Sequence, residues 1–233
     1  MTREVGSGQW LVGGAGDPLT TSHSPLTAGW HAALAEAWTA YLQGSYPIGA
    51  VVVDADGQVI ARGRNRLGEP RGVGNGVISG HDLAHAEINA LLDLKAVTRP
   101  ECHGWTVLTT VQPCPQCAGA IAMSGLRAVD YAAPDPWAGC TRLLTDDPYV
   151  SKKGMRVGRA PTGVERVALR LALVGFLEEG HGSLESSLMR SYRESHPQDV
   201  AAAEGLHRSG ALADLRRRRA EFPEALDLLG GGA

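Results

Sequence analysis

Apolar residues in the first third of the chain follow a helical period and then a strand pattern. Between residues 26 and 42 large apolar side chains recur every three or four positions, which predicts an amphipathic helix. Residues 48–65 contain two runs rich in Val and Ile around an Asp-Ala-Asp-Gly turn, which is typical of a β-hairpin. The consecutive valines at 51–53 predict a strand that is covered on both faces.

Strand-like and helical segments alternate further along the chain. Residues 67–80 come first, and their five glycines and one proline predict a long, mobile, irregular loop. The segments that follow predict a sheet between helices with parallel neighbouring strands. They are a helix at 85–96, a strand at 105–111, a helix at 114–124 and a strand at 128–131.

The C-terminal part is predicted to be helical. A strongly apolar helix is expected at 164–179, and a further helical segment at 211–229 contains Arg216 to Arg219. Four consecutive arginines on a helix point to all of its sides. We expect them to form a solvated surface with acidic neighbours such as Asp214 and Glu221, with RNA phosphates as the alternative partners.

Length and composition indicate one domain with appendages. At 233 residues with 43% hydrophobic content, the chain is long enough to bury a full core. A net charge of −3 gives no sign of a polyanionic partner such as tRNA or DNA. Because we find neither a signal sequence nor the roughly 20 apolar residues that span a bilayer, we expect a cytoplasmic protein without membrane association.

Two of the four cysteines, Cys114 and Cys117, stand three positions apart where a helix is predicted to begin. This spacing has two common explanations, a redox dithiol and a metal site, because the helix N-terminus favours thiolates in both. A closed structural zinc site would need a second pair of soft ligands, and Cys102 and Cys140 are isolated in the sequence. Spacing alone leaves the first two explanations open.

His85 and Glu87 favour the metal. One imidazole and two thiolates give Zn²⁺ three protein ligands and leave the fourth tetrahedral position for water, as in catalytic zinc sites. A carboxylate that takes a proton from this water helps the metal to activate it, and Glu87 is the candidate. Side chains two residues apart on a helix diverge by about 200°, so both reach one metal only if the helix points its first turn at it.

The combination of His-x-Glu with a later Pro-Cys-x-x-Cys is the signature of zinc deaminases. The chain resembles the cytidine deaminase-like superfamily from about residue 30 to 139, where YPIGAVVVDADGQVIARGRN, HAEINAL and PCPQCAGAI stand in the family's order. It is most similar to the branch of tRNA adenosine, guanine and dCMP-type deaminases. The resemblance implies an α/β fold, a three-layer α/β/α sandwich with a mixed sheet of about five strands.

The expected organisation is a flexible lead-in at 1–26, a zinc deaminase domain at 27–160 and a helical C-terminal extension packed on it at 161–233. By the resemblance, the zinc ligands are His85, Cys114 and Cys117. The catalytic residue is Glu87, and the substrate contacts are Asn65, Gly49 and Ala50. A homodimer is implied by the same analogy.

The expected function is hydrolytic removal of the exocyclic amine of a free nucleoside or nucleobase, with release of ammonia. The acidic charge balance and the glycine-rich loop, which could close over a small ligand, favour a small molecule over a base that is flipped out of a polynucleotide. The alternatives are a tRNA adenosine-to-inosine deaminase and, from another class, a non-catalytic zinc module or thiol-redox module.

Overall fold

The computed structural model describes residues 26–95, 100–178 and 186–230. The lead-in predicted at 1–26 lies outside the described residues apart from Leu26, as do the predicted helix ends at Ala96 and Glu179. The strands are β1 (Gly49–Val53), β2 (Val59–Arg64), β3 (Gly72–Gly74), β4 (Val77–Ser79), β5 (Thr106–Val111), β6 (Ala128–Ala133) and β7 (Arg156–Arg159). The α-helices are α1 (Ala28–Leu42), α2 (Ala86–Asp93), α3 (Pro115–Ser124), α4 (Arg142–Asp146), α5 (Thr162–Glu178), α6 (Ser187–Ser195), α7 (Pro197–Ser209), α8 (Ala211–Arg217) and α9 (Phe222–Gly230).

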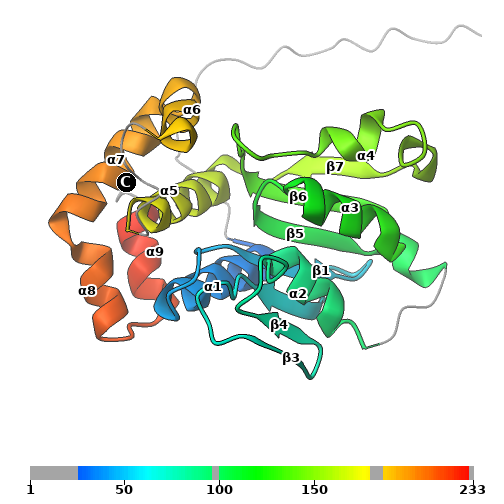
Figure 1. Ribbon diagram of the computed structural model, residues 1–233, viewed down its shortest axis with the longest axis horizontal. Coiled ribbons are helices and arrows are strands. Elements are labelled where there is room, and N and C mark those ends of the chain that lie inside the picture. Colours follow the sequence, from blue (N-terminus) through cyan, green and yellow to red (C-terminus); the bar gives the residue numbers. More distant parts are fainter. Residues whose placement is uncertain (1–25, 96–99, 179–185, 231–233) are drawn as a thin grey trace, which may run out of the picture.

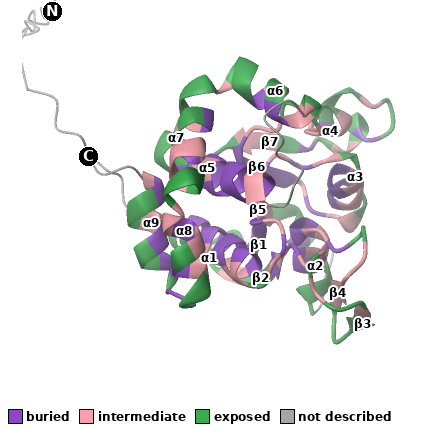
Figure 2. Ribbon diagram, turned by 60° about the vertical axis from the view of Figure 1, so that its left-hand side comes forward, coloured by how far each residue is buried: buried purple, intermediate pink, exposed green. Residues whose placement is uncertain are grey.

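Five strands form a mixed sheet in the order β2-β1-β5-β6-β7. β1 is antiparallel to both of its neighbours, whereas β5, β6 and β7 are parallel to one another. Helices α1 and α5 cover one face of the sheet, and α2 and α3 cover the other (Figures 1 and 2). The predicted three-layer α/β/α fold with a mixed five-stranded sheet is therefore confirmed.

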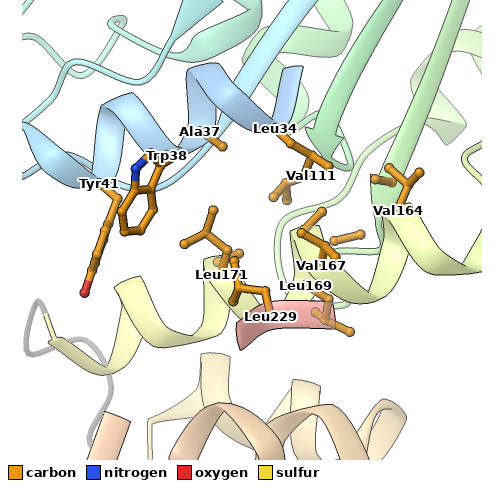
Figure 3. Close-up of a cluster of buried hydrophobic side chains, with 14 of the residues drawn as sticks. Leu34, Ala37, Trp38, Tyr41, Val111, Val164, Val167, Leu169, Leu171 and Leu229 are labelled. Carbon is orange, nitrogen blue, oxygen red and sulfur yellow. The ribbon is translucent and has the colours of Figure 1, made fainter. Parts of the chain in front are cut away.

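Side-chain alternation along the central strands builds a separate core on each face. Val51 and Leu108 pack with α1 and α5 in one core, which continues to the C-terminal helices (Figure 3). Val52 and Val107 point the other way and pack with α2 and α3. All five residues of β1 are buried, as the run of valines predicts.

The glycine-rich segment at 67–80 is more regular than its composition predicts. β3 and β4 pair as a short antiparallel hairpin below α2 (Figure 1), with Asn75 and Gly76 at positive φ in the turn. The side chain of Asn89 on α2 accepts a hydrogen bond from the Ile78 nitrogen at 2.9 Å and donates one to the Ile78 oxygen at 3.1 Å. The prediction of an irregular loop was wrong because this side chain provides the bonds of a neighbouring strand.

The C-terminal helices α6 to α9 form an arc around α5 (Figure 1). α5 itself packs on β5 and β6, so the helix that begins the predicted extension also forms part of the outer layer of the sandwich. Among the described residues, none of the helices has the length and apolar character needed to cross a bilayer.

The four arginines at 216–219 do not lie on one helix as predicted. α8 ends at Arg217, and Arg219 has a φ of 52°, so the chain turns before α9 begins. Asp214 pairs with Arg217 and Arg218, as expected, and Arg218 also pairs with Glu224. The shortest ion pairs of the cluster are Arg216–Glu178 at 3.3 Å, Arg217–Asp214 at 2.9 Å and Arg218–Glu224 at 2.7 Å.

Candidate active site

One edge of the main sheet brings together residues from four separate parts of the sequence. β1 begins and β2 ends at this edge because the two strands are antiparallel. β5 and β6 also end there, because they are parallel to each other and β5 is antiparallel to β1. Asn65 follows β2, Cys114 follows β5 and Asp135 follows β6, so these side chains belong to the same edge. Loops beyond the carboxyl ends of parallel strands are a common place for binding sites.

Two helices begin at this edge, and each begins with a predicted zinc ligand. His85 is the N-cap of α2, with extended backbone angles (φ −76°, ψ 157°), and Cys114 is the N-cap of α3 (φ −70°, ψ 173°). His85 therefore precedes the helix, whereas Glu87 lies in its first turn and is buried. This arrangement removes the divergence of about 200° that the two side chains would have on the side of a helix.

The distances between the three predicted ligands fit one metal ion. The Nδ1 atom of His85 lies 3.5 Å from the sulfur of Cys114 and 3.5 Å from the sulfur of Cys117, and the three atoms lie within 4.8 Å of one another. Zinc bonds of about 2.0 Å to nitrogen and 2.3 Å to sulfur at a tetrahedral angle would separate these atoms by about 3.6 Å. Among the described residues, the ligand cluster contains no fourth side chain, so one position is open.

The protonation of the site follows from its hydrogen bonds and burial. A hydrogen bond from the Cys117 thiol is the main cause that lowers the pKa of Cys114 to about 4, with a contribution from His85 and against the effect of burial. Burial raises the pKa of the Glu87 carboxyl, which lies 3.3 Å from the Cys117 sulfur. The site thus combines a thiolate ligand with a carboxyl group suited to hold and release a proton.

Residues 25–133 match the family model described as the cytidine and deoxycytidylate deaminase zinc-binding region. Residues 25–133, just under half of the chain, are therefore a zinc-binding region of the cytidine deaminase-like superfamily. The zinc-binding region of this superfamily and the His-Cys-Cys ligand set together identify the cofactor as Zn²⁺.

The proteins that this chain is similar to include two of tRNA metabolism. The tRNA-specific adenosine deaminase of Bacillus subtilis is 38% identical over 114 residues, which are 48% of this chain and 64% of that protein. The tRNA(Ile)-lysidine synthase of Deinococcus radiodurans is 33% identical over 154 residues, 63% of this chain and 25% of that protein. The chain thus spans less than two thirds of either relative.

A solved structure from a study of A-to-I editing by tRNA:A34 deaminases at the wobble position of transfer RNA is also similar. It has a TM-score of 0.50 and 28% identity, and the match covers 63% of this chain and 99% of that one.

A cavity of about 470 Å³ opens beside the metal ligands of this deaminase-like site. Its lining comes from the sheet edge, from the helix starts and from the C-terminal extension. The described residues that line it include no lysine or arginine. They are Tyr46, Ile48, Asn65, His85, Ala86, Glu87, Val111, Gln112, Cys114, Asp135, Trp137, Ala138, Phe176, Ser186, Ser187 and Leu188.

The predicted substrate contacts fall into two groups. Asn65 lines the cavity and is only 2% exposed, and its Oδ1 atom accepts a hydrogen bond from the Leu67 nitrogen at 3.0 Å. Gly49 and Ala50 are not among the cavity residues. Gly49 faces α1, where an added Cβ would lie 2.1 Å from the Ala33 oxygen, and Ala50 is buried in the core under α2 and α3. Ile48, one residue earlier, reaches the cavity instead.

Sequence reasoning missed the cavity residues that follow β6 and those of the extension. Asp135 and Trp137 had a detectable signal, because they follow a predicted strand whose neighbour ends near Cys114, and parallel neighbours end at the same edge. Phe176 and Leu188 had none, because their distance along the chain gives no indication that α5 and α6 reach the site. The glycine-rich segment expected to close over a ligand does not contribute to the lining within the described residues.

Proposed function

We propose that the protein is a zinc-dependent hydrolytic deaminase that removes the exocyclic amine of a free nucleobase or nucleoside. The observation that carries the proposal is a His-Cys-Cys cluster that could hold a metal ion, with a buried carboxyl group beside it, at the wall of one cavity. His85, Cys114 and Cys117 would hold the zinc, and Glu87 would move the protons.

Zinc held by these residues supplies a Lewis acid that makes water a nucleophile at neutral pH. Glu87 accepts one proton from the attacking water and passes it to the ring nitrogen. It then takes the second proton from the added hydroxyl group and passes it to the departing amine. A carbon–oxygen bond replaces the carbon–nitrogen bond, so one water is consumed and one ammonia is released. The raised pKa of Glu87, caused by its burial, suits a group that must both take and give a proton.

The lining of the cavity supports an uncharged substrate. It combines the carboxyl groups of Glu87 and Asp135 with no lysine or arginine among the described lining residues, so a nucleotide phosphate would find no cationic partner inside it. Tyr46, Trp137 and Phe176 provide aromatic surface for a planar ring. These features favour a base or nucleoside over a nucleotide.

The second candidate function is deamination of adenosine in tRNA, which the similarity to the tRNA-specific adenosine deaminase of Bacillus subtilis favours. Of the arginines at 216–219 that could contact phosphates, those at 216, 217 and 218 are paired with carboxylates in the structure. Binding of tRNA that weakens steeply with added salt, together with inosine formation, would favour this candidate over the free base or nucleoside.

The test is an ammonia-release assay on zinc-loaded protein with cytosine, guanine, adenine and their ribonucleosides. We expect turnover of at least one compound, and a loss of about 10²- to 10⁴-fold in Glu87→Ala with one zinc retained per chain. Turnover in Glu87→Ala close to that of the wild type contradicts the proposed role. A protein without stoichiometric zinc contradicts the zinc mechanism and favours the thiol-redox alternative.

We also propose a homodimer that uses the surface of α2 and α3. Three large apolar side chains on or beside these helices are exposed, namely Leu83 at 54%, Leu92 at 44% and Met123 at 58%. Clustered exposed apolar residues are typical of interaction sites. Sedimentation of the wild type as a dimer and of Met123→Glu as a monomer is the expected result, and a monomeric wild type contradicts it.

A further inference from the structure

Asp135 is a rigidly held carboxylate in the wall of the cavity. Its backbone nitrogen donates to the Oε1 atom of Gln112 at 3.1 Å, and its backbone oxygen accepts from the Gly139 nitrogen at 2.9 Å. Its Oδ1 atom accepts hydrogen bonds from the nitrogens of Trp137 and Ala138, both at 2.9 Å. The residue is therefore fixed before any ligand binds, which is what a binding site requires.

Both backbone hydrogen bonds go to Oδ1, so they leave the second carboxylate oxygen of Asp135 available to other groups. Tyr192 of α6 lies beside this carboxyl group. The Tyr192 side chain is fully buried, and the Asp135 carboxyl group is the hydrogen-bond acceptor next to its hydroxyl. Burial and the neighbouring Asp135 charge raise the pKa of Tyr192, so the hydroxyl remains a donor. A buried donor and a carboxylate acceptor thus stand together behind the cavity wall.

Aromatic contacts fix Tyr192 in this position. The ring of Phe176 on α5 lies 6.1 Å from the Tyr192 ring and 5.7 Å from the Tyr46 ring, measured between centroids. Phe176 and Tyr46 both line the cavity. The row of three rings therefore connects α6 to the cavity wall, and Tyr192 can move little without disturbing that wall.

We propose that α6 completes the substrate site, because Tyr192 positions the Asp135 carboxylate to accept a hydrogen bond from the substrate. The inference deepens the proposed function and rests on it. An ionised carboxylate only accepts hydrogen bonds, so the bound group is an N–H or O–H donor. Two sources have this chemistry: a ring N–H or amine of the base, and a hydroxyl of the ribose.

The experiment measures kcat and KM of the zinc-loaded wild type and of Asp135→Asn, Tyr192→Phe and the double variant on the six compounds named above. We expect KM to rise about 10- to 100-fold in Asp135→Asn and about 3- to 10-fold in Tyr192→Phe, with much smaller changes in kcat. Because Tyr192 acts through Asp135, the double variant should lose no more than Asp135→Asn alone.

The matched control is Tyr41→Phe, since Tyr41 is also buried and its hydroxyl donates to Glu178 at 2.7 Å, outside the cavity lining. It should leave KM unchanged. A KM increase for ribonucleosides alone assigns the donor to the ribose, and an equal increase for bases assigns it to the ring, and both results support the proposal. Zinc content and thermal melting show that each variant is folded.

The outcomes separate the two proposals. If the wild type releases ammonia while KM is unchanged in Asp135→Asn and in Tyr192→Phe, this inference is overturned and the proposed function stands. Equal losses in Tyr192→Phe and Tyr41→Phe also overturn it, since they indicate a general packing effect. If the zinc-loaded wild type acts on none of the six compounds, the proposed function fails and this inference fails with it.

Discussion

The cysteines that follow β5 occupy different environments, and only some of them suit a metal. Cys114 is a low-pKa thiol 3.5 Å from the His85 ring, whereas Cys140 is half-buried and lies outside the ligand cluster of the described residues. We expect Cys114→Ser to lose zinc and activity, because a serine hydroxyl does not ionise to form the missing ligand. Metal analysis after dialysis measures this.

Cys140→Ser is the matched control and should keep one zinc per chain. Its backbone nitrogen donates to the Pro113 oxygen at 2.8 Å, and this bond does not depend on the side chain. Loss of zinc in both variants would indicate a general disturbance of the segment around α3 rather than removal of a ligand.

Asp135 should reduce stability at neutral pH, because burial raises its pKa from the ordinary 3.8. The folded protein then holds this proton to higher pH than the unfolded chain. The stability contributed by the carboxyl is thus fully present below about pH 3.8 and is lost as pH rises through the folded-state pKa. Asparagine does not titrate and can still accept the two backbone hydrogen bonds.

Asp135→Asn should therefore melt at a higher temperature than the wild type at pH 7, and the difference should shrink as the pH approaches 4. Calorimetry from pH 4.5 to 8 tests the trend. A constant difference, or a wild type that is more stable at pH 7, would contradict a cost from burial. Substitutions at functional sites commonly raise the stability of a protein while they weaken its function, and Asp135→Asn is expected to behave in this way.

At the residue scale, most of the metal site was accessible from the sequence, and the cavity was not. Cys-x-x-Cys with His-x-Glu restricts the chemistry strongly, since few other sites need two thiols, an imidazole and a carboxyl group at these spacings. From the sequence, His85 and Glu87 could reach one metal only on the condition that the helix points its first turn at it. The structure meets this condition by placing His85 just before α2. Asp135 is one carboxylate among many in the sequence, and only the parallel pairing of β5 and β6 relates it to Cys114.

Among the elements, α2 must approach the sheet closely to bring Glu87 to the site, and Gly63 of β2 allows this. A Cβ atom at Gly63 would lie 2.1 Å from the Ala90 nitrogen and 2.3 Å from the Ala86 oxygen, both in the backbone of α2. We expect Gly63→Ala to displace the helix, with a loss of about 1–3 kcal/mol in unfolding free energy and on the order of 10²-fold in activity. Urea unfolding and the ammonia assay measure the two effects.

Gly205 provides the control for this substitution. It lies within α7, and a Cβ atom there would meet nothing within 4 Å. Gly205→Ala should raise stability by about 0.5–1 kcal/mol through helix propensity and leave activity unchanged. Unchanged activity in Gly63→Ala would show that the position of α2 does not depend on this contact.

Elements with a regular apolar period were predictable, and those made by side-chain contacts were not. α1, β1, β2, β5 and α3 appear where the pattern places them. The β3–β4 hairpin escaped prediction because glycine dominates it and Asn89 of α2 provides its hydrogen bonds. The break between α8 and α9 had a sequence signal that the prediction missed, because Pro223 cannot continue a helix from the preceding residues. The turn at Arg219 itself was not predictable, because arginine seldom adopts a φ of 52°.

On the scale of the whole molecule, the C-terminal helices share a core with the sheet. The Trp38 ring nitrogen on α1 donates to the Ala220 oxygen at 2.8 Å, across 182 positions of sequence. Leu212 of α8 and Leu229 of α9 are fully buried in the core that also holds Val51 of β1. Figure 3 shows Leu229 close to Leu169 and Leu171 of α5. The sequence could not show this, because amphipathic helices do not specify which sheet they cover.

This shared core predicts that the deaminase fold and its extension unfold together. Leu212 lies in the core beneath α1 and α5, whereas Ile121 of α3 lies in the core on the other face of the sheet, and both side chains are fully buried. Leu212→Ala and Ile121→Ala should each cost about 2–5 kcal/mol, because each leaves a cavity. Since the sheet joins the two cores, each substitution should shift one common transition.

Urea unfolding followed by tryptophan fluorescence and by far-ultraviolet circular dichroism measures this in the zinc-loaded protein. We expect the two signals to coincide in the wild type and to move together in both variants. If Leu212→Ala produced an early transition seen by circular dichroism while zinc stayed bound, the extension would be a separate folding unit. The cavity residues of the extension, such as Phe176 and Leu188, would then be able to move away while the metal site stays intact.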